Sequence, residues 1–305
     1  MDSIWDSYMT LGLVHPMAFP AALEGVDASI PDTIRRVAED GFFTAIDVTW
    51  IKDASARKAA SATLRQSGMR VNFAGQTAQL KAGVNLNDPD AAKRASGVAL
   101  MKQCVDMAAE MGAQSFCMLS GADPGEAGRE AAFGWLVESL LEVGAYAKTK
   151  GLPVAVKVFD QKVEKKCLVG PHAIAARLAV TMRKTLPDFG LCHDLSHIPL
   201  LDETPAESLH ALAPYLVQAH MGNCVKQAGH ALYGDQHPLF GIEGGESGVP
   251  ELASYLKVLF DVGFLGKGKR PFVGFEMKPS PGVTSEMVIA NCKRSFKAAW
   301  AMLQV

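Results

Sequence analysis

Segments of strand character and segments of helix character alternate through the whole sequence, and this alternation constrains the fold more than any other feature. Short apolar runs predict strands, and most of the longer segments between them begin near a proline or an aspartate, as helices often do. The predicted strands cover residues 11–15, 43–48, 69–74, 113–119, 153–159, 189–194, 215–220 and 271–276. The predicted helices cover residues 31–40, 53–66, 87–111 (capped at 87–89), 129–150, 171–185, 205–213, 250–262 and 285–303. Such alternation is typical of a parallel sheet whose strands are joined by helices.

The number of strand–helix units predicts a closed barrel. Eight units in 305 residues match one (β/α)8 TIM barrel of the α/β class, so we predict a single domain over residues 1–305. An open doubly wound sheet is the alternative, and it usually carries a G-x-G-x-x-G turn after its first strand. The segment 16–20, PMAFP, lacks that turn. Residues 221–249 show no clear periodicity, and we expect so long a loop to cover a functional site.

Charge and cysteine content exclude several classes of protein. Lys and Arg number 30 against 32 Asp and Glu, and the resulting net charge of −2 argues against a nucleic-acid or membrane-surface partner. No apolar run approaches the roughly 20 residues that span a bilayer. Residues 1–10 carry Asp2 and Asp6 where a signal peptide would be basic. The six cysteines are scattered without a C-x-x-C pair, which indicates reduced thiols in a cytoplasmic protein.

Polar residues lie where the predicted strands end. In a parallel barrel these ends meet at one face, where active sites are found. The candidates that close a strand, or follow it closely, are His15, Asp47, Trp50, Lys157, Asp194, His197, His220, Asn223 and Glu276. Asp194, His220 and Glu276 close three consecutive strands, and together they offer the oxygen and nitrogen ligands that suit Mn²⁺, Mg²⁺, Zn²⁺ or Fe²⁺. We therefore predict that these three residues converge as metal ligands.

Motifs at these positions resemble those of a known superfamily. The segments 194–197 (DLSH), 219–223 (AHMGN) and 274–276 (GFE) resemble the xylose isomerase-like (AP endonuclease 2 type) TIM barrels. The resemblance implies a sugar isomerase, epimerase or lyase with a divalent metal, Mn²⁺ or Mg²⁺, and places His197 on the substrate side. The segments 14–20 (VHPMAFP), 159–161 (FDQ) and 233–238 (YGDQHP) are similar to those of the C-glycoside deglycosidase catalytic-subunit group.

Lys157 departs from the superfamily pattern, which has a glutamate ligand at this position of strand five. The exchange removes a ligand and adds a positive charge, so we expect metal binding to be weak or absent. It also removes one of the two opposing bases that the resemblance implies for epimerases. Three roles remain open for Lys157: an ammonium in place of the metal, paired with Asp194 and Glu276; a base or Schiff-base amine with a depressed pKa; or an outward-facing structural residue.

We expect chemistry next to a carbonyl group of a sugar or keto-sugar. A cation there would stabilise an enediolate while a carboxylate or imidazole takes the proton. The catalytic candidates are Glu276, His197, His237 and Lys157, and the substrate-binding candidates are His15, Asp47, Trp50, Asn223 and Asp235. His237 lies in the long loop, where Asp235 is placed to orient its imidazole. The lysines at positions 162, 165 and 166 are expected to form a solvated loop.

Two other classes of function remain as alternatives. One is a sugar-binding relative that has lost its catalytic or metal-binding role. The other is a DNA repair enzyme of the AP endonuclease type, which the net charge of −2 disfavours. The expected partner is a small sugar, and a homo-oligomer or a small partner subunit is left open.

Overall fold

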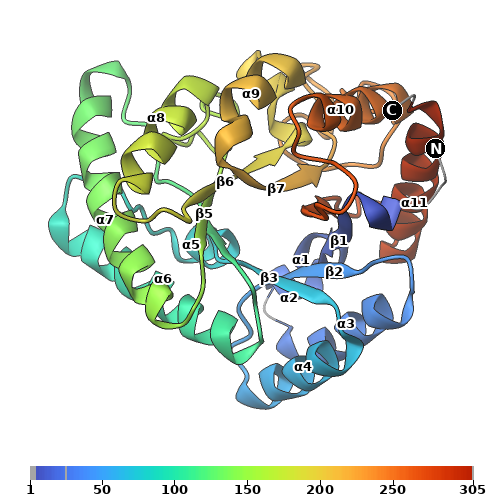
Figure 1. Ribbon diagram of the computed structural model, residues 1–305, viewed down its shortest axis with the longest axis horizontal. Helices are drawn as coiled ribbons and strands as arrows, with labels where there is room; N and C mark the ends of the chain where they lie inside the picture. Colours follow the sequence, from blue (N-terminus) through green and yellow to red (C-terminus); the bar gives the residue numbers. More distant parts are fainter. Residues whose placement is uncertain (1–4, 25, 304–305) are drawn as a thin grey trace.

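The chain folds into a closed barrel of eight parallel strands, β1 to β8. The computed structural model describes residues 5–24 and 26–303, so part of the expectation about a signal peptide lies outside the described residues. The last strand pairs with the first, from Thr10–Phe272 to Leu13–Phe275. Figure 1 shows the helices as a ring around the strands, in the order of the chain. The prediction of a (β/α)8 TIM barrel is confirmed.

The strands lie within a few residues of their predicted places. They are β1 (Thr10–Val14), β2 (Ala45–Val48), β3 (Arg70–Ala74), β4 (Phe116–Met118), β5 (Val154–Lys157), β6 (Gly190–Asp194), β7 (Leu216–Met221) and β8 (Phe272–Phe275). One strand end needs correction. His15 does not close β1 but begins the short helix α1 (His15–Ala18), because Pro16 occupies a first-turn position where its missing N–H is tolerated.

The helices also follow the prediction. They are α3 (Ile30–Glu39), α4 (Ala54–Ser67), α6 (Ala91–Glu110), α7 (Arg129–Thr149), α8 (His172–Arg183), α9 (Pro205–Leu212), α10 (Val249–Asp261) and α11 (Ser285–Met302). The short helices α1, α2 (Ala21–Glu24) and α5 (Gln76–Ala82) were not predicted. The expected cap at residues 87–89 is wrong, since the Asp90 carboxylate accepts the N–H groups of Ala92 and Lys93 and so caps α6.

A phenylalanine ring fills the barrel interior beneath the C-terminal strand ends. The ring of Phe272 lies so close to Gly12 and Gly274 that an added Cβ would be 2.5 Å and 2.8 Å from its atoms. Neighbouring inward-facing side chains are small, and Cys117, Ala155 and Cys192 form their own buried cluster. Most of the apolar core lies instead between the strands and the helices.

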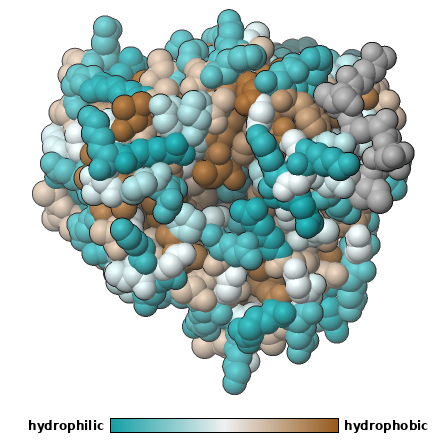
Figure 2. Space-filling model, in the orientation of Figure 1, coloured by the Kyte–Doolittle hydropathy of each residue, from teal (hydrophilic) through white to brown (hydrophobic). Residues whose placement is uncertain are grey.

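Three further features concern the cysteines, the helices and the surface. All six cysteines are buried and free. Within the described ranges, we find no helix that combines the length and the apolar character needed to cross a bilayer. Figure 2 shows mostly hydrophilic residues on the face in view, with apolar residues gathered near its middle. The cytoplasmic location stays a prediction.

Candidate active site

A cavity of about 370 Å³ lies at the C-terminal ends of the strands. The short helices after β1 and β3 contribute Met17 and Leu80 to its lining. The loops after β5 and β7 contribute Lys165 and Asp235, and Glu276 follows β8 directly. Segments far apart in the sequence thus share one cavity, which has the size of a small-molecule site.

An ionic network, which we call the ionic centre, occupies the barrel next to this cavity. Lys157 is fully buried, with its Nζ 2.8 Å from Asp194 Oδ2 and in contact with Glu276 Oε2. His220 Nδ1 lies 2.5 Å from Glu276 Oε2, and its Nε2 lies 2.9 Å from Asp47 Oδ2. Strands β2 and β5 to β7 supply four of these side chains, and Glu276 follows β8. The predicted convergence of Asp194, His220 and Glu276 is present in the structure.

The charges of the ionic centre stabilise one another. Burial lowers the pKa of Lys157, but the Asp194 and Glu276 carboxylates raise it by more, so the net shift is upward. Burial also lowers the pKa of His220, yet Glu276 and Asp47 raise it to about 10. Burial raises the pKa of Glu276, whereas Lys157 and His220 bring it down to about 2. Lys157 is therefore an ammonium held by carboxylates, which excludes the outward-facing role and disfavours the amine nucleophile.

A second set of buried groups, the histidine cluster, adjoins the ionic centre. Asp235 Oδ1 lies 2.9 Å from His237 Nε2 and 3.3 Å from His197 Nδ1. His237 Nδ1 donates to the Glu276 carbonyl oxygen at 2.8 Å. Burial lowers the pKa of His237, but Asp235 more than compensates and raises it to about 9. His237 is therefore an imidazolium whose two nitrogens are both held by oxygen atoms.

His197 differs from His237 in charge and in bonding. Burial lowers its pKa despite the nearby Asp235 and Asp194 carboxylates, so its imidazole is neutral. Its ring packs on Phe159, with 4.5 Å between ring centres. In the described part of the chain, neither ring nitrogen has a hydrogen-bond partner. Because buried polar groups are nearly always satisfied, these nitrogens indicate a place for a ligand.

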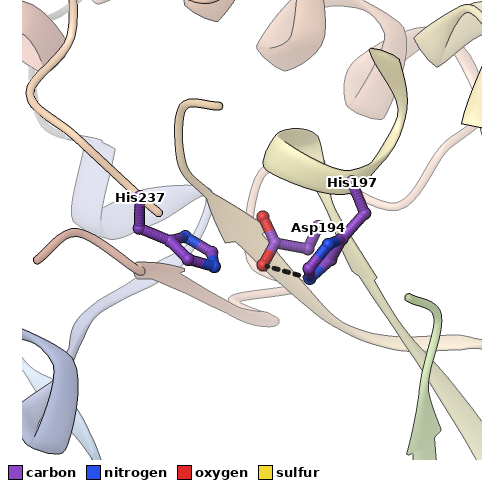
Figure 3. Close-up of side chains that lie close together, drawn as sticks. All are labelled: Asp194, His197 and His237. Carbon is purple, nitrogen blue, oxygen red and sulfur yellow. Dashed lines mark ion pairs between the residues drawn. The ribbon is translucent and has the colours of Figure 1, made fainter. Parts of the chain in front are cut away.

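Two groups of side chains bring possible metal ligands within 4.8 Å of one another: Asp194, His220 and Glu276, and Asp194, His197 and His237. The first group does not fit a divalent cation, because Lys157 contacts both carboxylates and both nitrogens of His220 are hydrogen-bonded. The second group does not fit either, because both nitrogens of His237 are held by oxygen atoms and Lys157 contacts the Asp194 carboxylate, although neither nitrogen of His197 has a hydrogen-bond partner among the described residues. Figure 3 shows His197 and His237 on either side of Asp194.

Three predicted substrate-binding residues lie away from the cavity. The His15 ring Nε2 is 2.8 Å from Thr33 Oγ1 and stacks on Phe19, because the start of α1 turns it toward the helices. Trp50 lines a different depression, where the Lys52 ammonium covers its ring. Asn223 donates to the Leu239 carbonyl and accepts from the Ser247 N–H, so it holds the long loop in shape. None of these three side chains lines the cavity beside Glu276, so their contact with a substrate stays a prediction. Asp47 lies within the ionic centre, and Asp235 lines the cavity.

The structure adds two residues that the sequence analysis had placed in a solvated loop or passed over. Lys165 Nζ lies 3.0 Å from Asp235 Oδ2, and the Lys165 side chain is only 20% exposed. Glu164 accepts the backbone N–H of Asp235 at 2.7 Å. A signal was present in Asp160, since an aspartate after a strand often accepts the N–H groups of the following turn. It does so here, and the turn directs Lys165 inward.

Comparisons with known proteins agree with this architecture. The family described as xylose isomerase-like TIM barrel matches residues 34–288. No curated protein matches the sequence significantly. Solved structures similar to this chain have low sequence identity to it, so the likeness shows a shared fold. The 3-keto-D-glucoside 4-epimerase from E. coli has a TM-score of 0.69 and 13% identity, covering 94% of this chain and 99% of that chain.

Two further solved structures have the same fold. The D-allulose 3-epimerase from Methylomonas sp. has a TM-score of 0.67 and 16% identity, covering 97% of this chain and 96% of its own. The IOLI protein with a bound zinc atom has a TM-score of 0.73 and 14% identity, covering 97% of this chain and 100% of its own. The match spans nearly the full length in each case.

Proposed function

This chain belongs to the xylose isomerase-like TIM barrel family, and we propose that it is a carbohydrate enzyme that transfers a proton next to a carbonyl group. The substrate is a sugar or a keto-sugar, and the outcome is of the isomerase, epimerase or C-glycoside lyase type. One observation carries this proposal: a carboxylate, Glu276, and an imidazolium, His237, line the same small cavity. The two epimerases of the same fold are named for sugar substrates, which supports the substrate class.

The geometry indicates different roles for Glu276 and His237. Glu276 Oε2 is held by Lys157 and His220, whereas Oε1 makes neither contact and lies 3.8 Å from His237 Nε2. We assign to Glu276 Oε1 the removal of the proton from carbon, and to the His237 imidazolium the stabilisation of the negative charge that develops on the substrate oxygen. Because a carboxylate with a pKa of about 2 is a weak base, the reaction depends on cations that stabilise the enediolate. His237, which lines the cavity, supplies one of them.

Neither group of candidate ligands among the described residues suits a divalent cation, because Lys157 contacts the carboxylates of the first group and both nitrogens of His237 are held in the second. At the ionic centre we propose that the Lys157 ammonium takes the cation's place. A single carboxylate base then remains, which favours a one-base isomerase or lyase over an epimerase with two opposing carboxylates. The predicted metal ligands Asp194, His220 and Glu276 would then form a set held by the Lys157 ammonium.

Exchange of a carbon-bound proton with solvent tests the proposed function directly. Incubation with D-fructose, D-allulose and a 3-keto-D-glucoside in D₂O should introduce deuterium next to the carbonyl, detected by NMR. Glu276→Gln should reduce the exchange rate by about 100-fold or more, since it removes the base. Glu243→Gln, an exposed glutamate of the long loop, is the matched control and should retain full activity.

The same assay distinguishes catalysis from sugar binding alone. The ammonium at position 157 specifically favours this second function, because a metal-bound relative of this fold would lose a ligand there. A folded protein that binds a keto-sugar by calorimetry, yet shows no exchange with any member of the panel, would overturn the proposed reaction and leave sugar binding as the function.

A further inference from the structure

The loops after β5 and β7 are tied together beside the cavity. Glu164 Oε2 accepts the backbone N–H of Asp235 at 2.7 Å and the side-chain amide of Gln236 at 3.1 Å. Lys165 Nζ lies 3.0 Å from Asp235 Oδ2 and 2.7 Å from Glu164 Oε1. We call these four residues the strap. All four line the cavity, so the strap forms part of its wall.

The sequence of the β5 loop explains why Lys165 points inward. The Asp160 carboxylate is fully buried and accepts the N–H groups of Val163, Glu164 and Lys165 at 2.7–2.8 Å. These bonds curl the chain into a tight turn. Lys162 remains exposed, while the Lys165 side chain is four-fifths buried. A lysine is rarely buried to this extent unless it has a carboxylate partner.

Asp235 connects the strap to the histidine cluster. One carboxylate oxygen faces Lys165, and the other lies 2.9 Å from His237 Nε2 and 3.3 Å from His197 Nδ1. His237 has a φ of +50°, a left-handed conformation that is uncommon for a residue other than glycine. Such a backbone persists only where its surroundings hold it. The hydrogen bond to the Glu276 carbonyl and the contact with Asp235 are those restraints.

We propose that Lys165 is a positioning residue for the proton transfer, acting through Asp235 to hold the His237 ring in its working orientation. This rests on the proposed function, in which the His237 imidazolium stabilises the charge that develops on the substrate oxygen. Without the ammonium, Asp235 would be a carboxylate at 1% side-chain exposure with only imidazoles beside it. The carboxylate would turn toward solvent, and the imidazole would lose one of its two anchors. Because misorientation affects the transition state more than the ground state, kcat should fall while KM changes little.

Three variants separate this role from a merely structural one. Lys165→Met removes the ammonium, Lys165→Arg retains a cation, and Lys162→Met is the matched control on the same loop. With D-allulose, or the keto-sugar of the panel that exchanges fastest, Lys165→Met should lower kcat by about 10- to 100-fold, as loss of an orienting partner does elsewhere. KM should change by less than about two-fold. Lys165→Arg should recover most of the rate, and Lys162→Met should be indistinguishable from wild type.

A double-mutant cycle tests the route through Asp235. If Lys165 acts through Asp235, the variant with both Lys165→Met and Asp235→Asn should be no slower than Asp235→Asn alone. Multiplicative losses would overturn the proposal. An increase in KM at unchanged kcat would overturn it as well, because it would show that Lys165 contacts the substrate directly.

An activity-independent measurement separates failure of this inference from failure of the proposed function. Amide hydrogen exchange over residues 233–238 should be faster in Lys165→Met than in wild type and Lys162→Met, by about 10-fold. If no sugar reacts but this difference is seen, the proposed function fails and the strap stands. If exchange is equal in all three proteins, the strap is not held by Lys165, whatever the protein catalyses.

Discussion

At the residue scale, the ammonium of Lys157 lies where the family resemblance places a carboxylate ligand. It contacts Asp194 and Glu276, and it carries no exposed surface. A buried cation of this kind is stable only with its anionic partners, and those partners equally need a cation. We therefore propose that the ionic centre needs no metal, because Lys157 occupies both carboxylates that would otherwise serve as ligands.

This arrangement predicts how metal content responds to substitution. Lys157→Glu should create a set of three carboxylates and one imidazole, and so bind Mn²⁺ tightly. The comparison is made in a His197→Ala background, which removes the second group of candidate ligands. After identical dialysis, we expect little Mn²⁺ in the protein with Lys157 and close to one equivalent with Lys157→Glu, measured by mass spectrometry of the metal. Lys157→Met, which removes the charge without adding a ligand, is the control.

One result would contradict this explanation of Lys157. Retention of a full equivalent by the His197→Ala protein with its native lysine would mean that the metal and the ammonium coexist. Lys157 would then have to move away from Asp194 and Glu276 on metal binding.

His15 shows how a single buried imidazole affects stability. Its pKa is lowered to about 3 by burial alone, and Thr33 Oγ1 accepts from its Nε2–H because that hydroxyl donates to main-chain carbonyls. The unfolded chain, with a histidine pKa of about 6.5, binds the proton more tightly than the folded one. The folded state is therefore favoured above pH 6.5 and loses stability as the pH falls toward 3.

We expect His15→Gln to remove this dependence of the free energy of unfolding on pH, because glutamine keeps a donor but cannot be protonated. Between pH 6 and pH 4, the free energy of unfolding should fall more steeply in wild type than in the variant, by about 1.4 kcal/mol per pH unit. Urea denaturation at several pH values measures the difference. His210→Gln, at an exposed position on α9, should leave the slope unchanged; parallel curves for wild type and His15→Gln would be inconsistent with a neutral His15.

At the element scale, the cap of α6 is set by one aspartate among several polar residues. Asn87, Asp88 and Asp90 all precede the helix, but only Asp90 accepts the N–H groups of Ala92 and Lys93. Asp88 instead accepts the N–H of Asp90 and shapes the preceding turn. The side chain that caps a helix thus depends on the local backbone path as well as on residue type.

Loss of this cap should weaken a helix of 20 residues by a measurable amount. Asp90→Ala should lower the free energy of unfolding by about 1 kcal/mol, because two N–H groups lose their acceptor. Asp90→Ser, which retains a capping oxygen, should lower it by much less. Urea denaturation of the three proteins provides the measurement, and equal losses in both variants would point to the carboxylate charge instead of the cap.

At the scale of the whole molecule, the seam between β1 and β8 closes the barrel around one aromatic ring. Gly12 pairs with Gly274 across the seam, and the Phe272 ring lies against both. A side chain at either glycine would clash with this ring. The closure of the barrel and the packing of its interior therefore depend on the same two positions. The ring also lies near the His220 imidazole, which joins the closure of the barrel to the ionic centre.

Two alanine substitutions should therefore have opposite effects. Gly12→Ala places a Cβ 2.5 Å from the Phe272 ring and 3.2 Å from Ala45 Cβ, so we expect a loss of about 1–3 kcal/mol through overpacking. Gly134→Ala lies in α7 with no other group within 4 Å, and should add up to about 1 kcal/mol through helix propensity. Thermal unfolding measures both, and a Gly12→Ala protein as stable as wild type would show that the ring can move aside.

The fold class and the convergence of Asp194, His220 and Glu276 could be predicted from the sequence. These three residues close consecutive parallel strands, and such strands end at one face of a barrel, whereas Asp47 was expected to bind substrate and the direction of Lys157 was left open. These are properties of short segments, so they can be read without knowledge of the contacts between segments.

The orientation and charge of the other site residues depend on contacts between segments that are distant in the sequence. His15 turns toward Thr33 because a helix begins there, and Lys165 turns inward because Asp160 curls its loop around distant Asp235. The ammonium of Lys157 and the imidazolium of His237 likewise depend on carboxylates brought together from other parts of the chain. A pKa is set by burial and by the charges within a few ångströms, and those neighbours exist only once the barrel has closed.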